Sequence, residues 1–212
     1  MNLEDLSRDS CAVLVVVDQQ YDFEPGGALA VTQGDEIVEP ISDWMHRFQN
    51  VIVTQDFHPA GHISFASSYK NKKPFEHLRM DEVESGLVES SFSRDILIQY
   101  LKRTPQHEQV LWPDHCVQGT RGAEIDSRLP LHRAQLVIRK GIRRDCDSYS
   151  AFFENDGTST GLAGYLRDRQ IERVVLVGLA GDYCVAWSAR DARSLGFEVF
   201  APEHLTRNVR VV

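Results

Sequence analysis

Residues 173–192, RVVLVGLAGDYCVAWSARDA, decide the fold of this chain. The apolar run at 174–177 is typical of a strand buried on both faces of a parallel sheet, and the glycines that follow it indicate a tight turn. Apolar residues then recur at helical spacing at Val185, Ala189 and Ala192. The stretch therefore predicts a strand, a turn and a helix.

The ends of this helix, and the cysteine near its start, carry further predictions. Asp182 is expected to cap the N-terminus, and Gly196 falls where a left-handed C-terminal cap is common. Cys184 then lies in the first turn, where free backbone N–H groups and the positive end of the helix dipole lower the pKa of a thiol. This is the placement of a nucleophile; the alternative is a small, buried apolar side chain.

Composition limits the fold and the partners. The chain has 212 residues, 42% of them hydrophobic and 25% charged, so we expect a single α/β domain over residues 1–212. A net charge of -8 argues against nucleic acid or an anionic membrane as the main partner, and it favours a small-molecule substrate. Four widely spaced cysteines without a CxxC pair indicate reduced thiols. With no basic, apolar leader and no long apolar run, the sequence predicts a cytoplasmic protein.

Other apolar runs also end at ionisable residues. We expect strands at 11–17, 51–55, 136–139 and 196–200, and helices at 36–48 and 161–170. Strands that alternate with helices predict a doubly wound, mainly parallel sheet of Rossmann-like form with helices on both faces. Such sheets bind ligands at the carboxyl ends of their strands. The residues expected to converge there are Asp18, Asp56, Lys140 and Cys184.

Residues 67–109 interrupt this pattern. They are polar and weakly patterned, apart from one helix expected at 93–103. We interpret them as a long excursion from the core that serves as a lid or as a contact in a homo-oligomer.

Asp18, Lys140 and Cys184 form a chemically complementary set. A thiol nucleophile needs a group that takes its proton, and a carboxylate held beside a fixed cation can do so. Taken singly, Asp18 fits a strand-terminal turn and Lys140 fits a solvated surface. Together with Cys184 they favour a catalytic triad.

Asp56 and His58 indicate a metal site. They are separated by one residue, so their side chains point to the same side of an extended segment. One carboxylate and two imidazoles are typical ligands of a divalent transition metal, and either His115 or His62 supplies the third ligand.

Several segments, in order along nearly the whole chain, carry a family resemblance. They are DQQYDF at 18–23, QDFHPAGHISF at 55–65, WPDHCV at 112–117, KG at 140–141 and VGLAGDYC at 177–184. Together they resemble the nicotinamidases of the isochorismatase-like cysteine hydrolase superfamily. The combination of the DxH segment, the WPxHC segment and the glycine-rich turn into cysteine is specific.

The resemblance implies roles for individual residues. Asp18, Lys140 and Cys184 correspond to the catalytic triad. The metal ligands correspond to Asp56, His58 and His115, and the metal is usually zinc, with iron or manganese in some members; His62 is a ligand in some relatives only. The residues that match the substrate pocket are Phe23, Trp112, Tyr149 and Ala180. A cis peptide before Ala180 is also implied, with the N–H groups of Ala180 and Cys184 as an oxyanion hole.

The implied activity is hydrolysis of nicotinamide to nicotinate and ammonia in NAD salvage. Two alternatives stay open: another isochorismatase-like amide or vinyl-ether hydrolase, which would generally lack the metal ligands, and a non-catalytic ligand-binding relative. The excursion at 67–109 is longer than in compact bacterial members. Relatives also continue into another helix beyond the point where this sequence stops, at Val212. We therefore expect this chain to be truncated.

Overall fold

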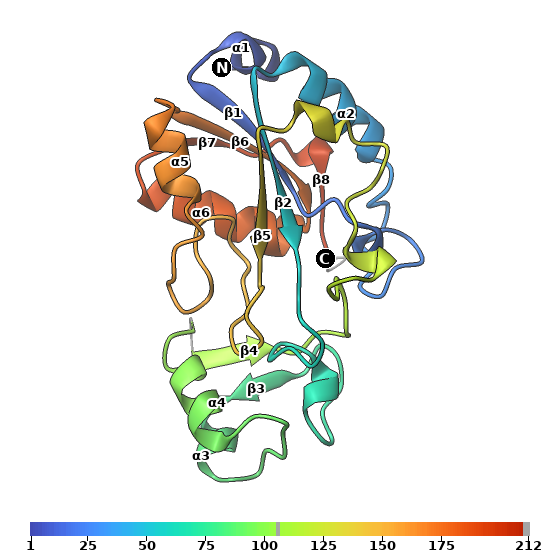
Figure 1. Ribbon diagram of the computed structural model, residues 1–212, viewed down its shortest axis with the longest axis vertical. Helices are drawn as coiled ribbons and strands as arrows, with labels where there is room; N and C mark the ends of the chain where they lie inside the picture. The colour runs from blue at the N-terminus through green and yellow to red at the C-terminus, as the bar shows by residue number, and fades with distance from the viewer. Residues whose placement is uncertain (105–106, 210–212) are drawn as a thin grey trace.

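The computed structural model describes residues 1–104 and 107–209 of the chain (Figure 1). Its centre is a parallel sheet with strand order β5-β2-β1-β6-β7, and β8 also pairs with β6. The strands are β1 (Ala12–Val17), β2 (Asn50–Asp56), β5 (Leu136–Lys140), β6 (Arg173–Leu179), β7 (Glu198–Phe200) and β8 (Thr206–Arg207). The predicted doubly wound parallel sheet is confirmed, and the predicted strands differ from the observed ones by one or two residues at their ends.

Helices cover both faces of the sheet. The even-numbered residues of β1 pack in one core with α1 (Leu3–Arg8) and α2 (Val38–Arg47). Its odd-numbered residues pack in a second core with α5 (Leu162–Asp168) and α6 (Ala186–Ser194). Each fully buried Val or Leu contributes about 1.5 to 3 kcal/mol relative to exposure. A strand buried on both faces therefore needs the continuous apolar run that the sequence shows.

Residues 67–109 form a lobe below the carboxyl edge of the sheet (Figure 1), which we call the lower lobe. It contains the antiparallel strands β3 (His77–Arg79) and β4 (Glu108–Val110) and the helices α3 (Met80–Glu84) and α4 (Arg94–Leu101). A third apolar cluster, which includes Leu78, Leu97 and Leu101, holds it together. The helix expected at 93–103 is confirmed as α4, whereas β3, β4 and α3 had no clear pattern in the sequence. Residues 105–106 of the excursion lie outside the described residues.

Short helical turns connect these elements. They are η1 (Tyr21–Phe23), η2 (Ala66–Ser68), η4 (Arg121–Ala123), η5 (Leu131–Arg133), η6 (Gly181–Val185) and η7 (Glu203–Leu205). The turn η6 is a π-helical turn and the others are 3₁₀ turns. π-helical turns are rare in proteins, and those that do occur are often found at functional sites.

The predicted capping of the last helix is half right. Asp182 lies inside η6 and its carboxylate accepts a hydrogen bond from the Val209 N–H group at 2.9 Å, so the prediction that it caps the helix is wrong. The wide turn η6 moves the start of α6 beyond it. Gly196 has φ +91°, and the N–H group of Phe197 donates to the Ala192 carbonyl oxygen at 3.1 Å. This is the left-handed C-terminal cap that was expected.

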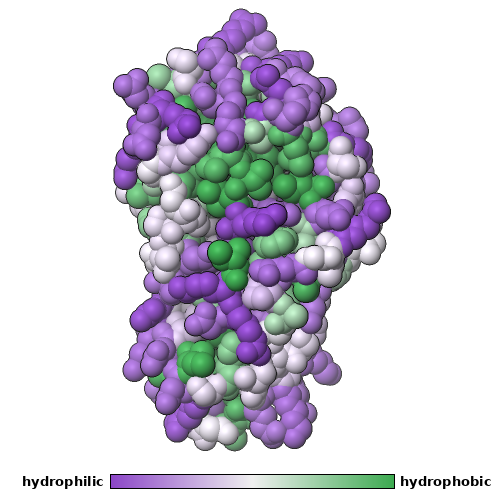
Figure 2. Space-filling model, viewed as in Figure 1, coloured by the Kyte–Doolittle hydropathy of each residue, from purple (hydrophilic) through white to green (hydrophobic). Residues whose placement is uncertain are grey.

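The surface differs between the two halves of the molecule. In the view of Figure 2, hydrophobic residues gather over the sheet, and the lower lobe is covered mainly by hydrophilic and neutral residues. All four cysteines have free thiols. Among the helices of residues 1–104 and 107–209, none has the length and apolarity to cross a membrane.

Candidate active site

The strand ends bring the predicted residues together at the carboxyl edge of the sheet. Asp18 follows β1, Asp56 ends β2 and Lys140 ends β5, while Cys184 lies in η6 just after β6. All four are buried. Parallel strands share one carboxyl edge, so residues up to 166 positions apart in the chain become neighbours there.

Lys140 is the centre of this cluster. Its Nζ atom lies 2.8 Å from Asp18 Oδ2 and 2.9 Å from Asp56 Oδ1, and it donates to the Ser148 carbonyl oxygen at 3.1 Å. The Cys184 Sγ atom is 3.5 Å away. The side chain is 0% exposed, so Lys140 is a buried, paired cation and not the solvated surface residue of the alternative interpretation.

Asp18 is held in one orientation by its neighbours. Its backbone is left-handed, with φ 45°, and its N–H group donates to Thr54 Oγ1 at 3.1 Å. The Thr54 hydroxyl donates in turn to Asp18 Oδ1 at 2.6 Å. Burial raises the pKa of the Asp18 carboxyl, and the Asp56 charge adds to this, while Lys140 opposes both. A carboxyl group with a raised pKa suits the uptake of a proton.

The thiol of Cys184 differs from the expectation. Burial raises the pKa of Cys184 well above its usual value, and the Asp18 and Asp56 carboxylates add to this, whereas Lys140 lowers it. The expectation of a lowered thiol pKa is therefore wrong, because desolvation and two carboxylates outweigh the helix terminus and Lys140. The raised pKa favours the thiol over the thiolate in the resting protein.

Two backbone features form the turn before Cys184. Gly178 has φ +104°, and a Cβ at this position would collide with the Val17 carbonyl oxygen on β1. Only glycine combines this conformation with such a close approach of two strands. The Leu179–Ala180 peptide bond is cis, as the family resemblance implies.

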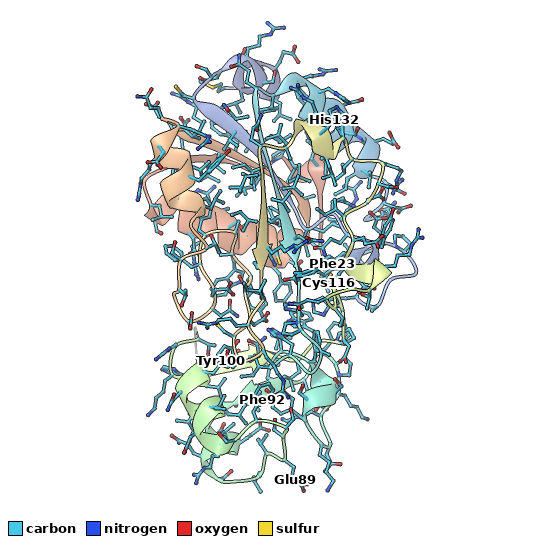
Figure 3. All side chains as sticks on the ribbon, in the orientation of Figure 1. Phe23, Glu89, Phe92, Tyr100, Cys116 and His132 are labelled. Carbon is cyan, nitrogen blue, oxygen red and sulfur yellow. The ribbon has the colours of Figure 1, made fainter. Side chains whose placement is uncertain are left out.

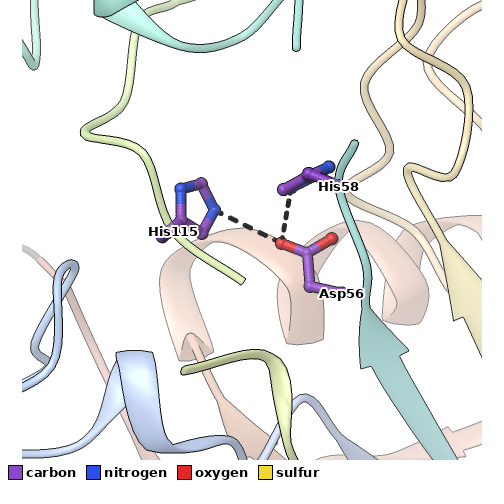
Figure 4. Close-up of side chains that lie close together, drawn as sticks. All are labelled: Asp56, His58 and His115. Carbon is purple, nitrogen blue, oxygen red and sulfur yellow. Dashed lines mark hydrogen bonds and ion pairs between the residues drawn. The ribbon is translucent and has the colours of Figure 1, made fainter. Parts of the chain in front are cut away.

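Asp56, His58 and His115 lie side by side (Figure 4). Asp56 Oδ2 is 3.0 Å from His58 Nε2 and 3.4 Å from His115 Nε2. The other ring nitrogens face carbonyl oxygens, His58 Nδ1 that of Gly141 at 3.0 Å and His115 Nδ1 that of Pro113 at 2.8 Å. Each Nδ1 therefore points at a carbonyl oxygen and each Nε2 points at the Asp56 carboxylate, so the two Nε2 atoms and the carboxylate converge on one point. The three ligand atoms lie within 4.8 Å of one another, so this donor set fits a divalent metal ion.

His62 has a different environment. Its ring stacks on His58 with 4.2 Å between ring centroids. Its Nδ1 contacts the Ser64 hydroxyl at 2.8 Å and its Nε2 contacts the Cys146 carbonyl oxygen at 3.0 Å. Burial keeps the pKa of His62 well below its usual value, so the ring is neutral. His62 also forms, with His58 and Asp147, a second group of buried side chains whose ligand atoms lie close enough together to hold a metal ion.

One cavity contains both Cys184 and His115 in its lining. It is lined by the four residues expected to contact substrate, Phe23, Trp112, Tyr149 and Ala180, together with Cys184, Asp56 and His115. Phe23 lies near the end of the sheet that faces the lower lobe (Figure 3). Its ring meets His115 edge-on at 5.5 Å, and Trp112 meets Tyr183 edge-on at 4.8 Å. The walls are thus aromatic, and both the Cys184 thiol and His115 face the same cavity.

Sequence reasoning missed other residues that line this cavity. They are Leu29, Asp147, Ser148, Tyr183 and Val209. Tyr183 could have been found, because it is adjacent to Cys184 in the same turn. Leu29 and Val209 lie outside any periodic pattern, and only the folded chain brings them to the cavity.

Comparisons with known proteins agree with this geometry. The profile of the isochorismatase domain matches residues 12–208. A curated relative named nicotinamidase, from Acinetobacter baylyi, is 46% identical over 91% of this chain and 78% of its own length.

Two solved structures are also similar. An Acinetobacter baumanii nicotinamidase and pyrazinamidase has a TM-score of 0.81 at 42% identity and covers 96% of this chain and 87% of its own. The zinc complex of a pyrazinamidase from Pyrococcus horikoshii has a TM-score of 0.67 at 32% identity, with 94% and 87% covered. From its domain match and from relatives of this similarity, the chain belongs to the nicotinamidases of the isochorismatase family.

Proposed function

We propose that this protein hydrolyses nicotinamide to nicotinate and ammonia through a thioester on Cys184, as a step of NAD salvage. The observation that carries the proposal is a cavity with aromatic walls that is lined by Cys184, Asp56 and His115. The buried Asp18–Lys140 pair lies directly beside the Cys184 thiol, with Lys140 Nζ 3.5 Å from Sγ. A flat aromatic ring with a carboxamide on one side and a ring nitrogen on the other fits this arrangement.

Binding uses the aromatic walls and the histidine end of the cavity. Phe23, Trp112 and Tyr149 enclose the pyridine ring and exclude water from it. Asp56, His58 and His115 would hold a divalent ion, for which we propose zinc, and this ion would supply a Lewis-acidic anchor for the pyridine nitrogen. The ring is then fixed at one end, and the carboxamide carbon lies at the Cys184 end of the cavity.

Attack begins with proton transfer from Cys184 to Asp18. As Sγ forms a bond to the carboxamide carbon, Asp18 takes the thiol proton, and Lys140 keeps the carboxylate ionised and oriented beforehand. The N–H groups of Ala180 and Cys184 stabilise the negative charge on the carboxamide oxygen. Asp18 passes the proton to the leaving nitrogen, the C–N bond breaks, and ammonia departs.

Hydrolysis of the thioester reverses these roles. A water molecule attacks the carbonyl carbon while Asp18 takes one of its protons. The C–S bond then breaks, the proton returns to the Cys184 sulfur, and nicotinate leaves. Because the pKa of the Asp18 carboxyl is raised, this group can accept one proton and return it in each half of the reaction.

The experiment is incubation of the purified protein with nicotinamide, with chromatographic detection of nicotinate and an independent assay for ammonia. We expect equal amounts of both products. Absence of nicotinate from metal-supplemented protein would contradict the proposal.

Cys184→Ala tests the nucleophile. We expect a loss of at least about 10³-fold in kcat, because no other described group takes the position of the sulfur. Circular dichroism and bound-metal analysis should match wild type, since only one sulfur atom is removed. Substantial amidase activity in this variant would contradict the thioester route.

A further inference from the structure

A chain of buried hydrogen bonds runs from the lower lobe into the substrate cavity. The Tyr100 hydroxyl on α4 donates to the Gln109 Oε1 atom on β4. The Gln109 Nε2 atom donates to Asp147 Oδ2 at 2.9 Å and to the Tyr149 hydroxyl at 2.9 Å. Asp147 and Tyr149 both line the cavity. The lobe therefore contacts pocket-lining residues through this amide side chain, in addition to the Phe75 ring, which meets the Trp112 ring edge-on at 5.9 Å.

The direction of this amide follows from its partners. Gln109 turns its N–H edge toward Asp147 Oδ2 and the Tyr149 hydroxyl, and its oxygen accepts from the Tyr100 hydroxyl. The two amide hydrogens of Nε2 are shared among three acceptors: Asp147 Oδ2, the Tyr149 hydroxyl and the Val110 carbonyl oxygen, which lies at 2.7 Å. Gln109 is 2% exposed, so water cannot replace a bond that is lost.

The Tyr149 hydroxyl accepts hydrogen bonds from two different side chains in the pocket wall. It accepts from Gln109 and, at 3.4 Å, from the Trp112 indole N–H. The Tyr149 ring meets the Trp112 ring edge-on at 6.4 Å and the Tyr183 ring edge-on at 5.6 Å. Rotation of Tyr149 would therefore move the surface against which an aromatic substrate packs.

We propose that Gln109 is a positioning residue of the substrate pocket, through which the lower lobe fixes the Tyr149 ring and the Asp147 carboxylate. This inference rests on the proposed function for the identity of the substrate. It gives residues 67–109 a role in substrate binding, in addition to any role as a lid or oligomer contact. Gln109 acts through its neighbours and does not touch the reacting atoms.

The test compares Gln109→Met with Gln99→Met. Methionine keeps the length and flexibility of glutamine but donates no hydrogen bond. Gln99 lies on α4 of the same lobe and is exposed, so it is the matched control. We expect Gln109→Met to raise the KM for nicotinamide roughly tenfold, with kcat within about threefold of wild type. Gln99→Met should change neither.

A second comparison asks whether Gln109 acts through Tyr149. In a Tyr149→Phe background the acceptor hydroxyl is absent, so Gln109→Met should raise KM by less than about threefold further. A purely structural role would lower the melting temperature and the fraction of active protein, which reduces apparent kcat and leaves KM unchanged. That pattern, or an unchanged KM in folded Gln109→Met, would overturn the proposal.

Two further measurements keep the test decisive. If Gln109→Met does not fold, Tyr100→Phe removes only the hydroxyl that orients the amide, and it should raise KM in the same direction. If wild type does not hydrolyse nicotinamide, the proposed function fails, and near-ultraviolet circular dichroism decides this inference separately. A changed aromatic spectrum in Gln109→Met but not in Gln99→Met supports it, and unchanged spectra in both overturn it.

Discussion

Lys140 lies between two carboxylates that serve different parts of the proposed chemistry. Asp18 is the proposed proton acceptor and Asp56 is a proposed metal ligand, yet both lie within 3 Å of the same Nζ atom. A buried ammonium offsets part of the repulsion between two buried carboxylates. Lys140 therefore links the proposed proton acceptor to the proposed metal ligand Asp56 electrostatically.

Glu24 is a second unusual carboxyl group, away from the catalytic cluster. It is 7% exposed, accepts a hydrogen bond from Gln19 Nε2 at 2.9 Å and lies 3.3 Å from an Arg128 guanidinium nitrogen. Burial and the neighbouring Asp126 carboxyl raise the pKa of Glu24 to about 7, against the bonds from Gln19 and Arg128. Its neighbour Phe23 lines the substrate cavity, so this cluster also helps to hold that loop.

Glu24 should make the free energy of unfolding depend on pH. The folded protein holds this proton up to about pH 7, whereas the unfolded chain loses it near the ordinary value of 4.5. Its stabilising contribution is thus complete below about pH 4.5 and disappears as the pH rises to about 7. Urea titrations at pH 5.5 and at pH 8 measure this. Between the two pH values the unfolding free energy of wild type should fall more than that of Glu24→Gln. Parallel pH profiles for the two proteins would refute the raised pKa.

At the scale of elements, the turn after β6 sets the position of Cys184. The strand pairs with β1 up to Gly178, and η6 then carries the thiol toward Lys140. The Gly178 backbone is left-handed and closely approached by Val17 on the neighbouring strand. Local backbone geometry and strand packing therefore act together on one position.

Gly178→Ala and Gly196→Ala form a matched pair that separates these two effects. Both glycines have positive φ, but a Cβ at Gly196 meets nothing within 4 Å, whereas one at Gly178 meets the Val17 carbonyl oxygen. We expect Gly196→Ala to cost about 1 to 2 kcal/mol of unfolding free energy and to keep kcat. Gly178→Ala should cost about 3 to 5 kcal/mol and lower kcat, because strain and overpacking add. Equal losses in urea titrations of the two variants would show that the contact with β1 is unimportant.

At the scale of the whole molecule, the proposed metal links separate parts of the chain. Asp56 and His58 follow β2, and His115 lies in the segment that returns from the lower lobe to the sheet. Ligands from two such segments come together only in the folded protein. A bound ion therefore favours the native state over the unfolded one.

Chelation should lower the melting temperature of the protein. An ion at 100 times its dissociation constant adds about 2.7 kcal/mol, which corresponds to roughly 5 to 10 °C for a chain of this size. The shift should be absent in His58→Ala and intact in His132→Ala, whose histidine is exposed in η5. Differential scanning fluorimetry with and without chelator measures it. An undiminished shift in His58→Ala would place the metal elsewhere.

The strands of the sheet and the candidate site residues could be predicted from local sequence patterns. Strands such as 11–17 could be read directly because a strand buried on both faces needs an unbroken apolar run, and its end is the point where Asp18 appears. The Asp56–His58 spacing and the turn into Cys184 are equally local. Most elements of the lower lobe were not predicted, because its strands are three residues long and the residues of its small apolar cluster are scattered along the sequence.

The interactions between these residues depend on the folded arrangement of the chain. The strand order β5-β2-β1 brought Lys140, Asp56 and Asp18 to one edge, where the Lys140 side chain contacts both carboxylates. The packing of the lower lobe brought Gln109 to Tyr149. The raised pKa of the Cys184 thiol, opposite to the expectation from its place in a helix, arises from burial and from carboxylates on other strands. Desolvation and Coulomb interactions depend on distance in space, and the positions that set them are up to 166 residues apart in the chain. The local sequence pattern therefore determines which groups lie at the strand ends, and tertiary packing determines their pKa values and the residues that they contact.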